Sequence, residues 1–481
     1  MKSLAVLSTA LFVLATAGYA QQPTTSGIPA HPGPLTARYQ NVANRILAAA
    51  ETDTDGYAAL TYLCDRIGNR HSGSSQLNTA VAWGAELMRK AGLENVHVES
   101  VMVPHWVRGH EQAALIAPIA RPLHMLGLGM SVGTPAGGIT APVVFVHSFD
   151  ELDALPRAAV SGKIVVFNPG WHGYGTGSNY RVNGPSRAAA KGAVAVLVRS
   201  ATGLALQTPH TGTLLYDPAQ PKIPAAALSV EDALLIERLA KDGPVTVHLA
   251  MEAHQEADVA SGNVIGELRG TEHPEQIVVL GGHIDSWDVG QGAQDDGAGI
   301  MAPFEAVSLL HKLGLRPKNT IRLVFWVNEE NGSAGAAAYY KNLGPEGVAL
   351  HRAAIEMDGG SEPPLGIGYA GFDHHNFDLT KLPKAQKTSF EAVEQIAALL
   401  KLIGADRVFA GGGGEDIEPL TSDGVASLSP QTSGAHYFDW HHTEADTLDK
   451  VDPVAFRHNI ALLAVTSYIL ADADLKLTGA K

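Results

Sequence analysis

Strand-length apolar runs alternate with helical segments over the C-terminal half of the chain. The runs are QIVVLGGH at 276–283, IRLVFWVN at 321–328 and HRAAIEMD at 351–358. Between and after them, apolar residues recur at helical spacing in the segments 300–313, 334–343, 390–402 and 453–470. This alternation predicts an α/β fold, with a mostly parallel central sheet and helices on both faces.

The N-terminal half has a different pattern. Helical spacing occurs at 38–50, 57–67 and 75–91, and 96–101 alternates like a strand. From about residue 118, Gly and Ala increase, and short strand-like runs such as KIVVF (163–167) and AVAVLV (193–198) are separated by loops. This block contains no cluster of acids and histidines, and we interpret it as an inserted β-rich domain.

The expected organisation follows from these patterns. Residues 1–20 are interpreted as a signal peptide, 21–125 as the first part of the α/β domain, 126–255 as the inserted domain and 256–481 as the remainder of the α/β domain. Lys2, an apolar run over 4–14 and small residues up to Ala20 are typical of a cleaved export signal. That run is shorter than the roughly 20 residues of a membrane span. We therefore expect a secreted or periplasmic protein with no membrane contact after cleavage.

Composition excludes two further features. With 34 Lys and Arg against 49 Asp and Glu, the formal net charge is −15, which argues against a nucleic-acid binder. Only one cysteine, Cys64, is present, so an intramolecular disulfide cannot form. Cys64 lies on an apolar helical face and is expected to be buried.

Acids and histidines follow the predicted strands of the C-terminal half. In an α/β sheet, ligands bind at the carboxyl ends of the strands, so these side chains should meet at one edge. Two histidines, His441 and His442, come from a later segment that also contains Asp446. The residues after the strands, or in the loops that follow them, are His283, Asp285, Asp295, Asp296, Glu329, Glu330 and Asp358.

A divalent cation would compensate this charge. Carboxylate oxygens and neutral imidazoles suit Zn²⁺. The acids outnumber what one tetrahedral zinc with an open position needs, whereas two ions about 3.5–4 Å apart, bridged by a carboxylate, would use them all. One of the adjacent glutamates, Glu329 and Glu330, could then bind metal while the other moves a proton.

Five motifs in this order and spacing resemble the co-catalytic zinc peptidases of family M28. They are GGHIDS, QDDGAG, NEENGSAG, EMDGG and HHTEADT. LCDRIGNRHSGS (63–74) is similar to the N-terminal signature of the family, and GGHIDSWDVGQG (281–292) resembles its plasma glutamate carboxypeptidase (carboxypeptidase Q) group. The inserted block resembles a protease-associated (PA) domain through GKIVVF, GAVAVLV and IPAAALS.

The resemblance implies two zinc ions per chain with a shared ligand. It places His283, Asp295 and Asp358 on one zinc, and Asp295, Glu330 and His442 on the other. His442 is preferred to His441 because the family pattern places the ligand four residues before the Asp of the closing DT.

The resemblance implies two further roles, and the neighbouring residues suggest others. Glu329 would be the general acid/base, and Asp285 would steady the histidine ligand beside it. Asp296 is expected to cap the following helix. Whether Asp446 orients His442 or caps a turn stays open. Tyr437 and Asp416 are candidate substrate contacts.

The implied function is a secreted two-zinc exopeptidase that hydrolyses dipeptides or short peptides with a metal-activated water. Three alternatives stay open: an aminopeptidase on longer peptides, a single-zinc glutaminyl cyclase, and an inactive receptor-like binding protein. The inserted domain could limit substrate length or mediate a homodimer.

Overall fold

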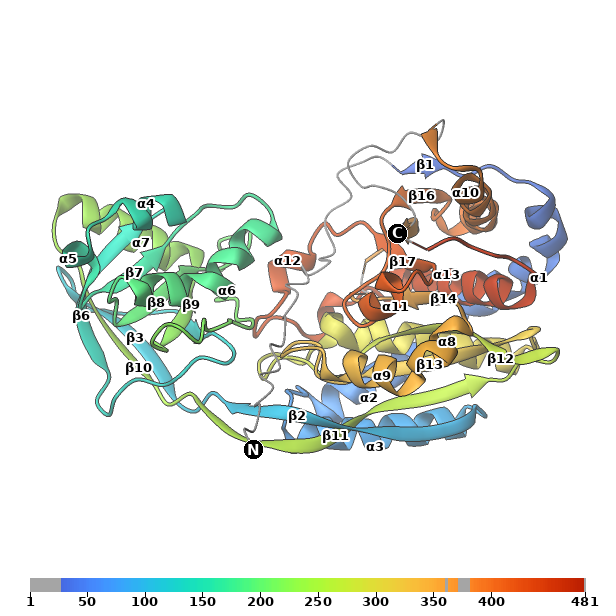
Figure 1. Cartoon of the computed structure of the whole chain (residues 1–481), viewed down its shortest axis with the longest axis horizontal. Coiled ribbons are helices and arrows are strands. Elements are labelled where there is room, and N and C mark those ends of the chain that lie inside the picture. The colour runs from blue at the N-terminus through green and yellow to red at the C-terminus, as the bar shows by residue number, and fades with distance from the viewer. Residues whose placement is uncertain (1–26, 360–361, 371–380, 480–481) are drawn as a thin grey trace, which may run out of the picture.

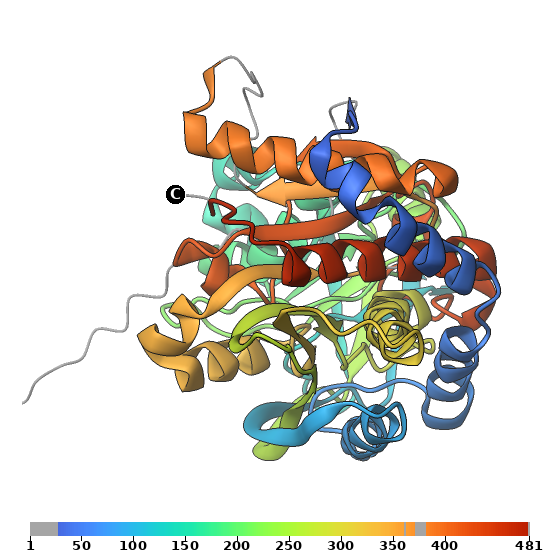
Figure 2. The ribbon, with the colours of Figure 1, turned by 90° about the vertical axis from the view of Figure 1, so that its right-hand side faces the viewer.

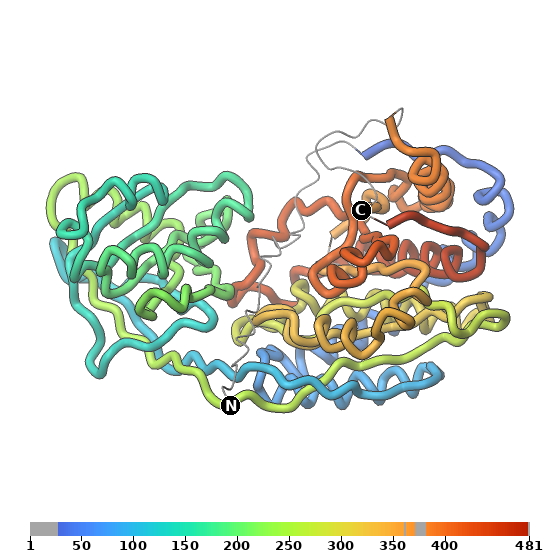
Figure 3. Tube along the Cα trace, in the orientation of Figure 1, coloured from blue at the N-terminus to red at the C-terminus, as the bar shows by residue number. Residues whose placement is uncertain are grey.

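Two β-sheets, each with its own helices, organise the chain into two lobes (Figure 1). The computed structural model describes residues 27–359, 362–370 and 381–479. The predicted signal peptide, residues 1–20, lies outside the described residues. The tube in Figure 3 shows that the chain passes from the first lobe to the second and returns once.

The first lobe contains a nine-stranded sheet, and parallel strands form its centre. β17, β14, β12 and β13 are neighbours and run parallel. The flanking pairs β13–β11, β11–β2, β17–β15 and β16–β1 are antiparallel. In spatial order the strands are β1 (Ile28–Pro29), β16 (Arg407–Ala410), β15 (Pro364–Ala370), β17 (Ser427–Thr432), β14 (His351–Glu356), β12 (His273–His283), β13 (Asn319–Trp326), β11 (His254–Leu268) and β2 (Glu94–Val107).

The sheet is therefore mixed, and the expectation of a mostly parallel sheet is corrected. Parallel neighbours need a crossover connection, and such pairs occur among the central strands and between β15 and β16, while the remaining neighbours are antiparallel. β2 and β11 instead pair as a long antiparallel ribbon, from Val107 opposite His254 to Glu94 opposite Glu267.

Helices cover both faces of this sheet, because alternate residues of each strand point to opposite sides. Val278, Leu280 and Phe325 pack with one set of helices, and Val279 and Trp326 pack with the other. The first set is α1 (Pro34–Glu51), α2 (Asp55–Tyr62), α3 (Ser75–Lys90), α8 (Gly299–Lys312), α10 (Lys384–Ala397) and α13 (Pro453–Asp472). The second is α9 (Ala334–Ala349) and α11 (Glu418–Ser422).

Helix α13 is a core helix of the first lobe. It is long and apolar enough to span a membrane, but 83% of its apolar window is buried inside the protein. It packs against α1 (Figure 2), and the ring centroids of Tyr39 and Tyr468 lie 6.4 Å apart between the two helices. Its length and hydropathy therefore reflect packing in the core.

The second lobe, which we define as residues 111–251, contains an eight-stranded sheet whose strands β6 to β9 are parallel. α7 packs on one face, and α4, α5 and α6 pack on the other. The strands, in spatial order, are β4 (Arg121–Leu123), β3 (Glu111–Ala117), β10 (Thr246–Met251), β6 (Ile139–Val146), β7 (Ile164–Phe167), β8 (Ala195–Arg199), β9 (Ala225–Leu228) and β5 (Met125–Gly127). The helices are α4 (Phe149–Ala154), α5 (Arg157–Val160), α6 (Tyr174–Ala190) and α7 (Val230–Asp242). The division of the chain at residues 126 and 255 and the likeness to a PA domain stay predictions.

A buried histidine of the first lobe generates a pH prediction. His351 is 7% exposed; its Nδ1 contacts the Gly347 carbonyl at 2.8 Å and its Nε2 contacts the Tyr339 hydroxyl at 2.9 Å. Burial lowers the pKa of His351 to about 4. Because the unfolded chain has a histidine pKa near 6.5, unfolding takes up a proton at acidic pH. Stability conferred by the neutral ring is present above pH 6.5 and is lost as the pH falls towards 4.

We expect this residue to contribute about 2 kcal/mol to the loss of unfolding free energy between pH 7.5 and pH 5. Urea unfolding at both pH values, with chelator present throughout, would compare the parent chain with His351→Gln. The variant should show a correspondingly smaller pH dependence, and an unchanged pH dependence would contradict a buried neutral histidine.

Candidate metal centre

The central strands end together, and their register places the candidate residues at one edge of the sheet. His283 pairs with Trp326 at the end of β12 and β13, and Gly281 pairs with Glu356 on β14. Glu329 and Glu330 follow β13 after two residues, and Asp358 follows β14 after one.

The first group of side chains surrounds His283. Its Nε2 lies 3.2 Å from Asp295 Oδ1 and 3.8 Å from Asp358 Oδ1. One ligand atom from each of these three residues lies within 4.8 Å of the other two. His283 and Asp295 are buried, whereas the Asp358 side chain is 36% exposed and faces solvent.

The second group shares Asp295 with the first. His442 Nε2 lies 3.2 Å from Asp295 Oδ2 and 3.1 Å from Glu330 Oε2. One carboxylate oxygen of Asp295 thus faces each histidine, which is the arrangement of a bridging ligand. The structure brings all five predicted ligands together.

The bonding of these atoms fits a cation. Three buried atoms, His283 Nε2, Asp295 Oδ2 and Glu330 Oε1, make no hydrogen bond with any residue in the described part of the chain. Buried polar atoms are normally satisfied, so converging nitrogen and oxygen lone pairs without hydrogen bonds are what a metal-ligand set requires.

The electrostatics of the site point the same way. Burial lowers the pKa of His442, but Glu330 and Asp295 outweigh it and raise this pKa to about 9. Burial raises the pKa of Glu329 well above its usual range, and the charges of Glu330 and Asp358 add to the effect. The site therefore has an excess of negative charge and favours a bound positive charge.

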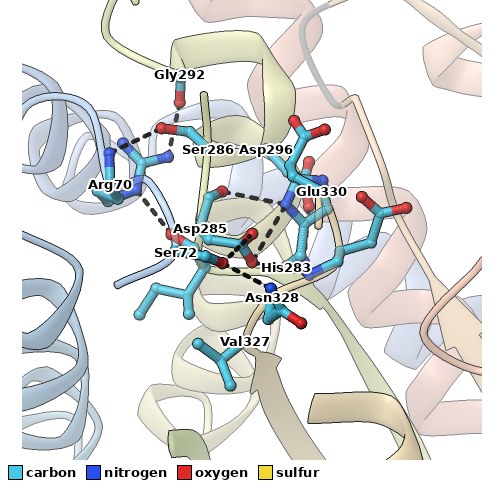
Figure 4. A network of polar contacts seen from close by, with 12 residues as sticks. Arg70, Ser72, His283, Asp285, Ser286, Gly292, Asp296, Val327, Asn328 and Glu330 are labelled. Carbon is cyan, nitrogen blue, oxygen red and sulfur yellow. Dashed lines mark hydrogen bonds and ion pairs between the residues drawn. The ribbon is translucent and has the colours of Figure 1, made fainter. Parts of the chain in front are cut away.

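Asp285 supports two of its neighbours in different ways (Figure 4). Its backbone carbonyl lies 3.1 Å from His283 Nδ1, whereas its carboxylate is 4.0 Å from that atom. The carboxylate instead accepts a hydrogen bond from Glu329 N at 3.1 Å. Asp285 thus orients the histidine through its backbone and the adjacent glutamate through its side chain.

Asp296 does not cap helix α8, so that prediction is wrong. Its carboxylate accepts hydrogen bonds from His283 N at 3.1 Å and Gly359 N at 2.9 Å. These two bonds tie the ends of β12 and β14 together, and this use of the carboxylate takes the place of a helix cap. The backbone of Asp295 and Asp296 is non-helical, which directs the two adjacent side chains differently.

Asp446 acts on the shared carboxylate. It accepts hydrogen bonds from Gln294 N at 2.8 Å and Asp295 N at 3.2 Å. The side chain therefore holds the segment that presents Asp295. Of the two possibilities left open by the sequence, neither a contact with His442 nor a turn cap describes this role.

The two adjacent histidines stack, with ring centroids 3.5 Å apart. His441 Nε2 lies 3.3 Å from Asp295 Oδ2, nearly as close as His442. Among the contacts of the described residues, His442 alone of the pair also reaches Glu330. This geometry favours His442 as the ligand.

Two supporting residues were missed by sequence reasoning. Arg70 is fully buried and donates hydrogen bonds to the carbonyls of Ile284, Gln291 and Gly292, so it fixes the loop after β12 (Figure 4). Trp287 Nε1 donates to Glu330 Oε2 at 2.6 Å. Both lie in motifs that the sequence singles out, GNRHSGS and GGHIDSWDVGQG, but neither residue type signals such a contact.

The two candidate substrate contacts lie near the site. The Tyr437 hydroxyl donates to Asp358 Oδ1 at 3.2 Å. Asp416 is 2% exposed, and neither of its carboxylate oxygens makes a hydrogen bond with the described residues. Its negative charge helps to raise the pKa of Glu329, after the larger effects of burial and of Glu330 and Asp358. Contact with substrate stays a prediction for both.

Fold and site together define a hydrolase class: an α/β sheet whose strand ends present histidine and carboxylate ligands around a shared aspartate. Residues 263–467 match peptidase family M28. The chain is 40% identical to carboxypeptidase Q of Mus musculus over 442 residues, which cover 91% of each protein.

Solved structures agree with this match. The crystal structure of a peptidase M28 precursor from Shewanella amazonensis SB2B is 32% identical, with a TM-score of 0.84, and the match covers 93% of this chain and 99% of that one. A zinc aminopeptidase from Bacillus subtilis, 20% identical with a TM-score of 0.64 over 88% of this chain and 97% of that one, shares the fold.

The chain belongs to peptidase family M28. The enzyme class predicted from the sequence, a metallopeptidase with exopeptidase relatives, is confirmed.

The structural role of Asp446 can be tested by measuring the free energy of unfolding. Asp446→Ala removes the acceptor of two buried backbone N–H groups, and each unsatisfied group costs about 1–3 kcal/mol. We expect the free energy of unfolding, measured with urea in the presence of chelator, to fall by about 3 kcal/mol. Asp449→Ala, three residues away and exposed, should change it by less than about 0.5 kcal/mol. Equal effects of the two substitutions would rule out the structural role.

Proposed function

We propose that the protein is a two-zinc exopeptidase that hydrolyses dipeptides or short peptides after export from the cytoplasm. The observation that carries the proposal is the position of Asp295, with one carboxylate oxygen facing His283 and the other facing His442. A single-zinc cyclase would not need this second, complete set of ligands.

The contacts support two ligand sets. His283, Asp295 and Asp358 would hold one zinc ion, and Asp295, Glu330 and His442 would hold the other. Bound zinc lowers the pKa of water and polarises the scissile carbonyl.

The proton transfer belongs to Glu329. One of its carboxylate oxygens lies within 4.8 Å of ligand atoms of His283 and Glu330, a position from which it could take up a proton at the metal centre and later release it to the leaving amine. The hydrogen bond from its backbone N–H to Asp285 fixes its position beside Glu330. One glutamate of the pair thus binds metal and the other moves the proton.

Substrate contacts are proposed for two further residues. Tyr437, through its hydroxyl beside Asp358, would contact the peptide near the more exposed ligand. Asp416 would offer its carboxylate to a positively charged group such as a free amino terminus. Relatives include proteins named for either terminus, carboxypeptidase Q and leucine aminopeptidase. An assay with peptide substrates therefore has to decide whether the enzyme removes residues from the amino or the carboxyl terminus.

Metal content and substrate range test the proposal together. We expect elemental analysis of the purified mature protein to give two zinc ions per chain. The same preparation should hydrolyse a panel of dipeptides and lose this activity on addition of chelator. Turnover of longer peptides with little action on dipeptides would instead identify an aminopeptidase. One zinc per chain, or no hydrolysis of any peptide, would overturn the proposed function.

The adjacent glutamates provide a matched pair of variants. Glu329→Gln should keep both zinc ions and lose at least a hundredfold in kcat, because it removes a general acid/base. Glu330→Ala should lose one zinc ion, because it removes a ligand. Equal metal contents in the two variants would contradict the division of roles.

A further inference from the structure

The second lobe contacts a proposed metal ligand of the first lobe directly. Thr211 lies in the loop between β8 and β9, and His442 follows α12 (Tyr437–Trp440), which stands between the lobes in Figure 1. Thr211 N donates a hydrogen bond to the His442 carbonyl at 3.0 Å. In return, His442 Nδ1 lies 3.3 Å from the Thr211 carbonyl.

This second contact determines how the imidazole is presented. A carbonyl oxygen can only accept, so Nδ1 must carry the hydrogen in this bond. Nε2 is then the atom that faces Asp295 and Glu330. A backbone acceptor of this kind fixes the tautomer and ring orientation of a metal-binding histidine.

Arg181, on α6, holds the Thr211 carbonyl in place. Its Nη1 donates to that oxygen at 3.1 Å and to the Tyr174 hydroxyl at 3.0 Å. The next residue, Gly212, has a φ of +136°, and a β-carbon there would lie 2.1 Å from Arg181 Nη1. Only glycine therefore allows the guanidinium to approach the carbonyl so closely.

Aromatic contacts join the same helix to the segment that carries the ligand. The ring of Tyr174 stacks on Phe438 at 4.7 Å and meets the edge of His441 at 4.8 Å. Arg181 thus links the Tyr174–Phe438 contact between the lobes to the Thr211 carbonyl, which orients His442.

The other ligand proposed for the same ion is also supported from the second lobe. Trp287, which donates to Glu330, packs so closely on Gly129 that a β-carbon there would lie 2.1 Å from its ring. Gly129 N donates a hydrogen bond to the Gly212 carbonyl at 3.0 Å. The backbone that contacts Trp287 is therefore joined directly to the backbone that contacts His442. The described hydrogen bonds of His283, in contrast, come from the first lobe.

We infer that the second lobe sets the affinity of the zinc position formed by Glu330 and His442, with Arg181 as a positioning residue that acts through the Thr211 carbonyl. The inference rests on the two-zinc function proposed above. It assigns the second lobe a role in completing the metal centre.

The test measures zinc affinity rather than activity alone. Competition with a chromophoric chelator would give the dissociation constants of both zinc ions in the full-length chain. In Arg181→Met we expect one constant to rise by about tenfold or more, within the range for loss of a partner that orients a metal-binding histidine, while the other stays unchanged. kcat should fall with little change in KM, and Arg181→Lys, which retains one donor, should recover part of the affinity.

Two further variants separate positioning from a general loss of folding. Arg199→Met removes another buried arginine of the second lobe, which donates to the Ser200 carbonyl, and should leave both zinc constants unchanged. Tyr174→Phe removes only the hydroxyl that Arg181 contacts and keeps the stacked ring. This substitution should weaken the binding of the same zinc ion to a smaller extent. It remains informative if Arg181→Met does not fold.

The outcomes also separate this inference from the function on which it rests. Parent protein that binds two zinc ions and hydrolyses peptides, combined with unchanged zinc constants in Arg181→Met and Tyr174→Phe, would overturn the inference alone. The inference would also be overturned if Arg181→Met weakened the binding of both zinc ions equally, or if Arg199→Met weakened zinc binding as much as Arg181→Met does. Parent protein with fewer than two zinc ions would overturn the proposed function and the inference together.

Discussion

The whole first lobe is organised around one electrostatic constraint, the concentration of carboxylates at the carboxyl edge of its central strands. Asp295 lies between two imidazoles, which hold its pKa well below the usual range even though burial alone would raise it. Glu330 and Asp285 are also buried and Glu329 is partly buried, and desolvation raises the pKa of each. So many acids in one buried place are unfavourable without a compensating cation, and the surrounding structure is arranged to hold them there.

Hydrogen bonds between side chains and backbone groups hold this arrangement in place. Asp446 and Asp296 each accept two backbone N–H bonds, and Arg70 donates to a series of carbonyls. Loops that would otherwise be free to move therefore have defined positions at the strand ends. The same principle applies at His442, whose ring is oriented by a carbonyl of the second lobe.

The sequence was informative where chemistry follows secondary structure. Buried strands followed by His283, Glu330 and Asp358 predicted where those side chains meet, because parallel strands in register end at the same edge. Asp296 and Asp446 were harder to interpret, since the direction of a carboxylate depends on local backbone angles that the residue type does not reveal. The contacts of Thr211 and Arg181 could not be predicted at all, because they join distant segments through a carbonyl that every residue possesses. The antiparallel pairing of the edge strands was not predicted for a related reason: pairing partners are not encoded in the apolar pattern of a single strand.

The β2–β11 ribbon has a consequence for the order in which the chain folds. β2 is far from its partner along the chain, since roughly 150 residues separate Val107 from His254, the pair nearest the second lobe. The strand pairs of the second-lobe sheet all lie within that interval, so this lobe can form while β2 still lacks its neighbour. Once formed, it brings its entering and leaving strands, β3 and β10, side by side and delivers the start of β11 to the end of β2. The second lobe then acts as a template that shortens the search for this long strand pairing.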